Sequence, residues 1–161
     1  MDTTKLETIT QQLIEKIIES VPTDWDKVMF YGENRGDHAE YFYYFFRKDS
    51  PEFLPDAEMH YILDLEPTDF YHEQKDEINN LILKLAGEFK ALGREPFTTM
   101  KLMIDDAGGL DLIYGYDGLR YDRAADYELK FTNKFVVPEW KARGGRPEKS
   151  AMRRVFELFF K

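Results

Sequence analysis

Hydrophobic positions near the start of the chain recur at steps of three and four, which is the period of an amphipathic helix. These positions are Leu6, Ile9, Leu13, Ile14, Ile17, Ile18 and Val21. Thr4 and Glu7 have the spacing of a capping box, in which a hydroxyl and a carboxylate each satisfy a free backbone amide. Because Pro22 cannot continue a helix, we expect this helix to end near residues 19–21.

Two β-hairpins are predicted by aromatic, β-branched and alternating positions. Residues 25–33 and 40–47 are rich in aromatic and β-branched side chains and flank an Asn-Arg-Gly-Asp turn. Residues 97–105 and 110–117 alternate apolar and polar positions around an Asp-Ala-Gly-Gly turn. The strand at 40–47 is aromatic on both faces, so one face can cover a core while the other needs a helix, a partner or exposed hydroxyls.

A long amphipathic helix is predicted from Thr68 to Leu92, because apolar residues recur at helical spacing and Gly93 follows directly. The preceding segment, from Lys48 to Pro67, contains three prolines and is expected to be mostly loop, with one short strand at residues 59–65. The amino-terminal half of the long helix is rich in acidic residues.

The last third of the chain has a weaker pattern. Residues 121–137 fit either a helix or a helix followed by a strand that ends before Pro138. A basic loop at residues 143–147 leads into a basic C-terminal helix at 147–160, which carries apolar side chains along one side.

Together these elements predict an α+β fold. Antiparallel hairpins are expected to form one sheet, packed by the N-terminal helix, the long central helix and the C-terminal helices. The chain has 161 residues, close to the prior of roughly 150 residues per domain, so a single domain over residues 1–161 is expected. With 43% hydrophobic residues the chain has enough apolar surface for a packed core.

Composition excludes several kinds of chemistry and location. The chain contains no cysteine, which rules out thiol nucleophiles, disulfides, iron–sulfur clusters and cysteine zinc sites. The first nine residues carry acids and threonines where a signal peptide needs a basic and then an apolar run, and no apolar stretch approaches ~18 residues. We therefore expect a soluble, cytoplasmic protein without a membrane partner.

Charge is distributed unevenly along the chain. The formal net charge is −9, which argues against direct binding to a nucleic acid backbone. Residues 49–80 hold ten acids and one lysine, whereas residues 141–161 hold seven bases and two acids. Acidic runs often serve only to keep a protein soluble. The alternative is a negative surface that attracts a basic partner and accelerates its encounter.

Neither a metal ion nor another cofactor is expected. The three histidines, His38, His60 and His72, lack the spacing of a histidine metal site. The segment 105–111 resembles the start of a calcium loop, but the twelfth position, where an EF-hand requires glutamate, is Tyr116.

No nucleophile-elbow, β-lactamase or phosphate-loop motif is present, so the sequence gives little support for an enzyme. One catalytic alternative stays open. Asp105, Asp111 and Asp117 would suit a small metal-dependent hydrolase if the second hairpin brought them together, with Asp105 opposite Asp117.

The order and spacing of several residue strings resemble those of the YezG-like immunity proteins. The resemblance covers roughly residues 6–138 and includes an aromatic strand and an acidic, leucine-rich helix. The strings are Val21-Pro22-x-x-Trp25-x-x-Val28-x-x-Tyr31-x-Glu33, Pro96-Phe97-Thr98, Gly109-Leu110 and Tyr114-x-Tyr116-Asp117-x-Leu119.

This resemblance implies an immunity protein, or antitoxin, of polymorphic toxin and contact-dependent growth inhibition systems. Such a protein is encoded beside a toxin and binds the C-terminal toxin domain, often a nuclease such as an RNase, in the cytoplasm of the producing cell. Other protein partners remain an alternative. A nuclease exposes a basic cleft for its polyanionic substrate, and a row of carboxylates can occupy that cleft in place of phosphates.

The expected partner-binding residues follow from this hypothesis. An acidic surface is expected to meet the basic groups of the toxin, with aromatic anchors at its edge. The acidic residues are Asp64, Glu66, Asp69, Glu73, Asp76 and Glu77, and the aromatic residues are Tyr41, Tyr43 and Tyr44. We assign Trp25, Tyr31 and Phe45 to packing despite their place in or near the shared strings.

Overall fold

The computed structural model describes residues 2–56, 68–120 and 123–146, with only the backbone described for residues 68–71. Its elements in chain order are α1 (Thr4–Ser20), β1 (Lys27–Asn34), β2 (Ala39–Phe46), β3 (Phe53–Pro55), α3 (Thr68–Ala91), β4 (Thr99–Asp105), β5 (Leu110–Gly115), α4 (Ala124–Phe131), the π-helical segment η2 (Thr132–Val136) and α5 (Val137–Ala142).

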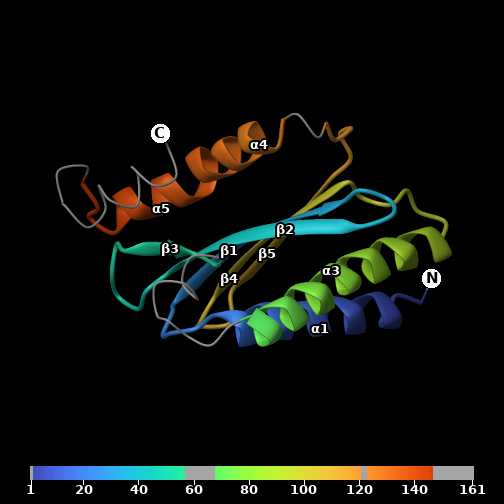
Figure 1. The fold of residues 1–161 in the computed structure, drawn as a ribbon, viewed down its shortest axis with the longest axis horizontal. Coiled ribbons are helices and arrows are strands. Elements are labelled where there is room, and N and C mark those ends of the chain that lie inside the picture. Colours follow the sequence, from blue (N-terminus) through green and yellow to red (C-terminus); the bar gives the residue numbers. More distant parts are fainter. Residues whose placement is uncertain (1, 57–67, 121–122, 147–161) are drawn as a thin grey trace.

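The strands form one antiparallel sheet in the order β3-β2-β1-β4-β5. Helices α1 and α3 cover one face of this sheet, and α4, η2 and α5 lie on the other (Figure 1). The predicted α+β fold, with hairpins in one sheet packed by N-terminal, central and C-terminal helices, is therefore confirmed.

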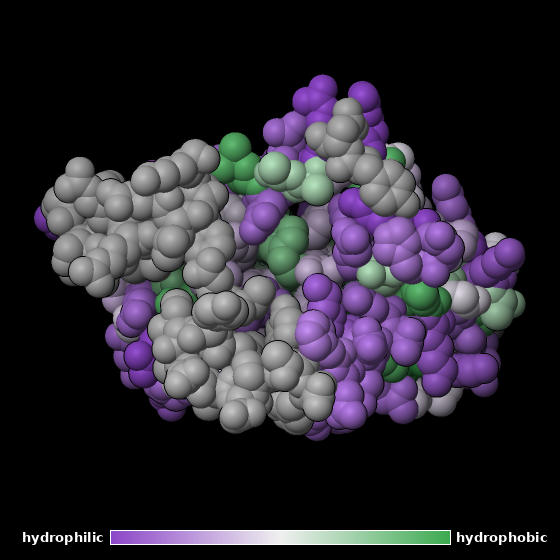
Figure 2. Space-filling model, in the orientation of Figure 1, coloured by the Kyte–Doolittle hydropathy of each residue, from purple (hydrophilic) through white to green (hydrophobic). Residues whose placement is uncertain are grey.

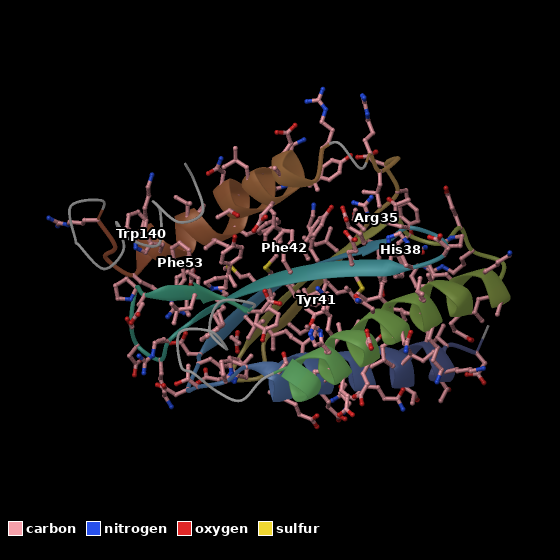
Figure 3. All side chains as sticks on the ribbon, viewed as in Figure 1. Arg35, His38, Tyr41, Phe42, Phe53 and Trp140 are labelled. Atoms are coloured by element: carbon pink, nitrogen blue, oxygen red, sulfur yellow. The ribbon has the colours of Figure 1, made fainter. Side chains whose placement is uncertain are left out.

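Two hydrophobic clusters lie on opposite faces of the sheet because successive side chains of a strand point to opposite sides. Val28, Phe30 and Phe45 belong to the cluster under α1 and α3, while Met29 and Phe46 belong to the cluster under η2 and α5. This arrangement explains the run of aromatic residues in β2, where both faces are covered by helices. Figure 3 shows the alternation, with Tyr41 and Phe42 on opposite sides of the strand.

The two long helices and both hairpins are confirmed, with differences of one or two residues at their ends. The predicted capping box is wrong. Helix α1 begins at Thr4 and is preceded by Thr3 at the N-cap, so Thr4 is already inside the helix. The carboxylate of Asp2 accepts the amide hydrogen of Thr4 at 2.9 Å, and the Thr3 hydroxyl donates to the Glu7 carboxylate at 3.1 Å.

Two further differences concern short or ambiguous segments. Strand β3 was not predicted, because its three residues give no readable alternation, yet its side chains are buried beside β2. The strand considered before Pro138 is not formed, since α4, η2 and α5 continue through this proline as helix. Pro138 is the second residue of α5, directly after the π-helical segment η2. The predicted strand at 59–65 and helix at 147–160 lie outside the described residues.

Arg143, predicted within a basic loop, fastens the end of α5 to the sheet. Its guanidinium contacts Asp26 at 2.6 Å and Glu139 at 3.1 Å, and it lies over the ring of Phe46 at 4.5 Å from the centroid. It also donates to the backbone carbonyl of Ser50 at 3.0 Å. Part of the basic charge near residue 143 is thus used within the fold.

Candidate functional site

Helices α1 and α3 run antiparallel and are joined by ion pairs near both ends. Lys16 contacts Glu77 at 2.7 Å, and Lys5 contacts Glu88 at 3.8 Å. The amino-terminal half of α3 therefore lies beside the carboxyl-terminal half of α1. Both segments are rich in carboxylates, so the helix pairing gathers acidic residues that are far apart in the sequence.

We call this carboxylate-rich surface the acidic face. Its members are exposed on the outside of the two helices, opposite the sheet. They are Glu15 and Glu19 of α1 and Glu73, Asp76 and Glu77 of α3. Much of the described α1–α3 surface visible in Figure 2 is hydrophilic. Because both helices are anchored on the hydrophobic core, these carboxylates are carried by a rigid scaffold.

A groove of about 420 Å³ runs between the two helices at this face. Glu15, Glu19 and Glu77 line it together with Lys16 and Lys84. Lys16 lies between carboxylates of both helices, at 2.7 Å from Glu77 and 3.3 Å from Glu19. The hydrogen bonds that Lys16 donates to Glu77 and to Glu19 raise the pKa of Lys16, so it remains charged and holds two of the carboxylates in place.

The structure describes the positions of four of the six predicted acidic residues. Glu73, Asp76 and Glu77 are exposed on one stretch of α3, as a binding surface requires. Asp69 lies in the first turn of α3, and Asp64 and Glu66 lie outside the described residues. Glu15 and Glu19 were missed because nothing in the local sequence shows which turns of two helices pack together.

The expected aromatic anchors are interior residues. Tyr43 is 1% exposed, and its hydroxyl lies 2.9 Å from that of Ser20 beneath α1. Tyr44 is also 1% exposed and donates to Glu128 of α4 at 2.7 Å, on the opposite side of the sheet. Tyr41 is half-buried and stacks on Phe30 at 5.4 Å between ring centroids. The prediction of surface anchors is wrong for Tyr43 and Tyr44, because two helical layers cover β2.

Of the residues assigned to packing, Tyr31 and Phe45 are buried and Trp25 packs against the cluster under α1 and α3. Tyr31 also has a polar role. Its hydroxyl donates to Glu33 at 2.8 Å, and Arg35 donates to the same carboxylate at 2.7 Å. Burial, followed by the hydrogen bond to Glu33, strongly raises the pKa of Tyr31. The Tyr-x-Glu string thus forms a buried network near the β1–β2 turn.

The aspartates of the hydrolase alternative do not come together. The Asp105 carboxylate accepts the amides of Ala107 and Gly109 and so stabilises the β4–β5 turn. Asp117 lies at the other end of the hairpin, where its carbonyl accepts the Thr98 hydroxyl at 2.7 Å. The pairing of Asp105 with Asp117 that this alternative requires is not formed, since the strand register pairs Ile104 with Leu110 beside the turn and Thr99 with Gly115 at the far end.

Within the described part of the chain, no group of three or more histidine, aspartate or glutamate side chains is arranged to hold a metal ion. His38 contacts Asp37 at 2.6 Å, and His72 is exposed. His60 lies outside the described residues. A search of the described helices for one long and apolar enough to cross a membrane finds none.

Comparison with known proteins adds independent information. The model of a family described as "Immunity protein YezG-like" matches residues 6–157. A protein named Immunity protein YezG from Bacillus spizizenii is 26% identical over 161 residues, covering 100% of this chain and 96% of the relative. A protein of the same name from Bacillus subtilis is 24% identical over 142 residues, covering 83% of this chain and 91% of the relative.

Proposed function

The chain belongs to the YezG-like immunity protein family, and we propose that it neutralises the C-terminal domain of a cognate toxin by binding it without catalysis. The proposed toxin is a nuclease that acts on RNA. The acidic face covers the basic active-site cleft of this toxin in the cytoplasm of the producing cell. No cofactor takes part, and the protein itself does not bind nucleic acid.

The observation that carries this proposal is the gathering of exposed carboxylates from two helices on one face. A nuclease cleft presents lysine and arginine side chains to phosphates, and charge-assisted hydrogen bonds to carboxylates use the same donors. Glu77 and Glu19 both contact Lys16, and this shared contact holds their carboxylates close to each other. A preorganised set of charges loses less conformational entropy on binding than a flexible one.

The proposed mode predicts that the acidic face is required for binding, and charge reversal tests this directly. The variant combines Glu73→Lys, Asp76→Lys and Glu77→Lys. The partner is the purified C-terminal domain of the toxin encoded beside this chain. We expect affinity, measured by calorimetry, to fall at least about 100-fold, because close charge pairs at such interfaces couple by several kcal/mol. RNA cleavage by the toxin domain should then resist inhibition.

The control variant combines Asp37→Lys, Glu95→Lys and Asp106→Lys, three exposed acids outside α1 and α3. Each triple variant raises the formal net charge from −9 to −3, because every change adds two charges. The control should bind with nearly the original affinity. Equal losses in both variants would show that overall charge matters rather than the acidic face. Unchanged affinity of the first variant would remove this face from the interface.

A further inference from the structure

Three lysines converge on the face of the sheet opposite the acidic face. Lys101 comes from β4, Lys130 from α4 and Lys134 from η2, and all three line a cavity of about 250 Å³. Tyr31, Tyr127 and Phe135 form much of its remaining wall. The Nζ atoms of Lys101 and Lys134 lie 5.8 Å and 5.5 Å from the centroid of the Phe135 ring.

Among the residues that the structure describes, these lysines have no carboxylate partner. Within the described ranges, no ion pair of 4.0 Å or less involves Lys101, Lys130 or Lys134, whereas Lys5 and Lys27 each form one and Lys16 forms two. Asp117 is the one acidic residue among the described residues that line the cavity. Burial, followed by repulsion from Lys134 and Lys130, lowers the pKa of Lys101. An anion in this cavity would offset both effects, because it attracts the charged form of Lys101.

A second hollow continues from the first along β4 and β5. It has a volume of about 440 Å³ and shares Lys134 and Phe135 with the lysine cavity. Its walls are largely apolar and include Met29, Met103, Ile113 and Pro138, with Asp111, Glu139 and Lys27 at its polar positions. Ile113 is 45% exposed although it lies in the middle of β5. We call the two connected hollows the lysine groove.

The groove exists because the C-terminal helices cover only part of their face of the sheet. Phe131 packs on Tyr31 of β1 and Phe42 of β2, with ring centroids 5.7 Å and 5.4 Å apart. Strand β5 is the last strand of the described sheet, on the side away from β2. The outer part of the β4–β5 face is therefore left open beside η2 and α5.

We propose that the lysine groove binds an acidic segment of a second protein, with carboxylates among Lys101, Lys130 and Lys134 and neighbouring apolar side chains on Ile113 and Phe135. Charge complementarity argues for this occupant. A free phosphate would satisfy the lysines but leave the apolar hollow unused. A nucleic acid carries a phosphate on every nucleotide and would place negative charge beside Asp111 and Glu139, whereas a peptide can place apolar side chains in this part of the groove.

This inference does not depend on the proposed toxin interface. The lysine groove is lined by residues of β4, α4 and η2 on one side of the sheet, and the acidic face lies on α1 and α3, which cover the other side (Figure 1). The protein can therefore hold a toxin and an acidic partner at the same time. A variant that loses the acidic peptide should still neutralise the toxin, and a variant of the acidic face should still bind the peptide.

The test uses the full chain and a short synthetic peptide in which two glutamates precede Leu-Val-Leu. A matched peptide carries glutamine at both glutamate positions. We expect the glutamate peptide to shift backbone NMR signals of β4, β5 and η2 and to leave those of α1 and α3 unchanged. Replacing Lys130 and Lys134 by glutamate should weaken binding about tenfold or more, since two charge interactions become repulsive.

Two double variants serve as controls. Lys130→Arg with Lys134→Arg keeps the charges and should keep binding. Lys84→Glu with Lys90→Glu makes the same charge change on exposed lysines of α3 and should alter affinity by less than about twofold. Lys130 and Lys134 are themselves exposed, so their variants should unfold at nearly the original temperature.

Several outcomes would overturn the proposal. Equal binding of the glutamine peptide would show that the lysines do not contribute. Inorganic phosphate that binds as tightly as the glutamate peptide would make the groove a small-anion site. Tighter binding of a short single-stranded RNA would make it a nucleic acid site. Self-association through β4 and β5 in concentrated solution would make the occupant a second copy of this chain.

Discussion

The ion pair between Glu33 and Arg35 is buried near the β1–β2 turn, where water is largely excluded. The side chains of Glu33 and Arg35 are 6% and 2% exposed, and Tyr31 donates a further hydrogen bond to the same carboxylate. Removing one partner of such a pair leaves an uncompensated charge in the interior. The buried network is therefore expected to contribute to the stability of the fold.

Replacing Arg35 by methionine should therefore destabilise the fold by about 3 kcal/mol. Urea unfolding of the variant and the original chain measures the difference. Arg123→Met is the matched control, because Arg123 pairs with Asp126 on an exposed helix surface and should cost less than about 0.5 kcal/mol. A loss no larger for Arg35→Met than for the control would show that the buried pair adds nothing to stability.

The buried hydroxyl of Tyr44 should make stability fall in alkaline solution. Burial, followed by the hydrogen bond to Glu128, strongly raises the pKa of Tyr44 in the folded state. Its unfolded pKa is about 10, so this contribution is complete below that pH and is lost as the pH rises above it. The free energy of unfolding, measured by urea titration from neutral to alkaline pH, should decline less steeply for Tyr44→Phe.

The exposed Tyr116 provides the control for this pH effect. Tyr116→Phe removes an exposed tyrosine hydroxyl and should leave the alkaline slope unchanged. Identical slopes for all three proteins would mean that Tyr44 ionises as easily in the folded chain as in the unfolded one.

The tyrosines of β2 show how far the surroundings of a single residue can be predicted from the sequence. Alternation correctly places Tyr43 and Tyr44 on opposite faces, because the side-chain period of a strand is two. Whether a face is covered depends on helices distant in the sequence, since Tyr43 contacts Ser20 of α1 and Tyr44 contacts Glu128 of α4. No local pattern carries that information, so the anchors predicted at the surface are part of the core.

At the scale of elements, long periodic segments were predicted accurately and short ones were not. Helices α1 and α3 each bury a continuous apolar stripe. The helical spacing of their apolar residues therefore repeats over many turns and can be recognised in the sequence. Strand β3 has three residues, too few to establish a period. For a related reason, the sequence indicated only the α3 residues of the acidic face. Its α3 residues form a local run, whereas Glu15 and Glu19 join them only through helix packing.

Two glycines, one inside α3 and one shortly after α5, should respond to alanine with opposite signs. A side chain at Gly87 of α3 would meet no atom within 4 Å, so Gly87→Ala should stabilise the fold by about 0.5–1 kcal/mol through helix propensity. A side chain at Gly145, after α5, would overlap the indole of the buried Trp140. Gly145→Ala should cost about 1–3 kcal/mol, as overpacking usually does.

Thermal and urea unfolding of both glycine variants check this pair of predictions. Each variant adds the same methyl group, so the comparison separates helix propensity from the packing of α5 on the sheet. Gly145→Ala as stable as the original chain would show that Trp140 moves aside without cost. A destabilised Gly87→Ala would mean that α3 is covered at that position.

At the scale of the whole molecule, the sheet separates two surfaces of different character. The acidic face on α1 and α3 suits a basic partner, and the lysine groove on the other side suits an acidic one. A net charge of −9 favours the first encounter over the second, because long-range attraction depends on the field of the whole protein. Binding at the lysine groove must then rely on short-range contacts.

This difference predicts how salt affects association with the toxin domain. Steering speeds association toward ~10⁸ M⁻¹s⁻¹ at low salt, and the Debye length shortens to about 10 Å at 0.1 M ionic strength. The association rate, measured by stopped flow, should fall at least about tenfold from low to high salt, while the dissociation rate changes much less.

Two sets of neutral variants locate the charges responsible. Neutralising the acidic face with Glu73→Gln, Asp76→Asn and Glu77→Gln should reduce the salt dependence of the association rate more than neutralising Asp37, Glu95 and Asp106. An equal reduction by both sets would assign steering to the net charge, and a salt-independent rate would show that the encounter is not electrostatic.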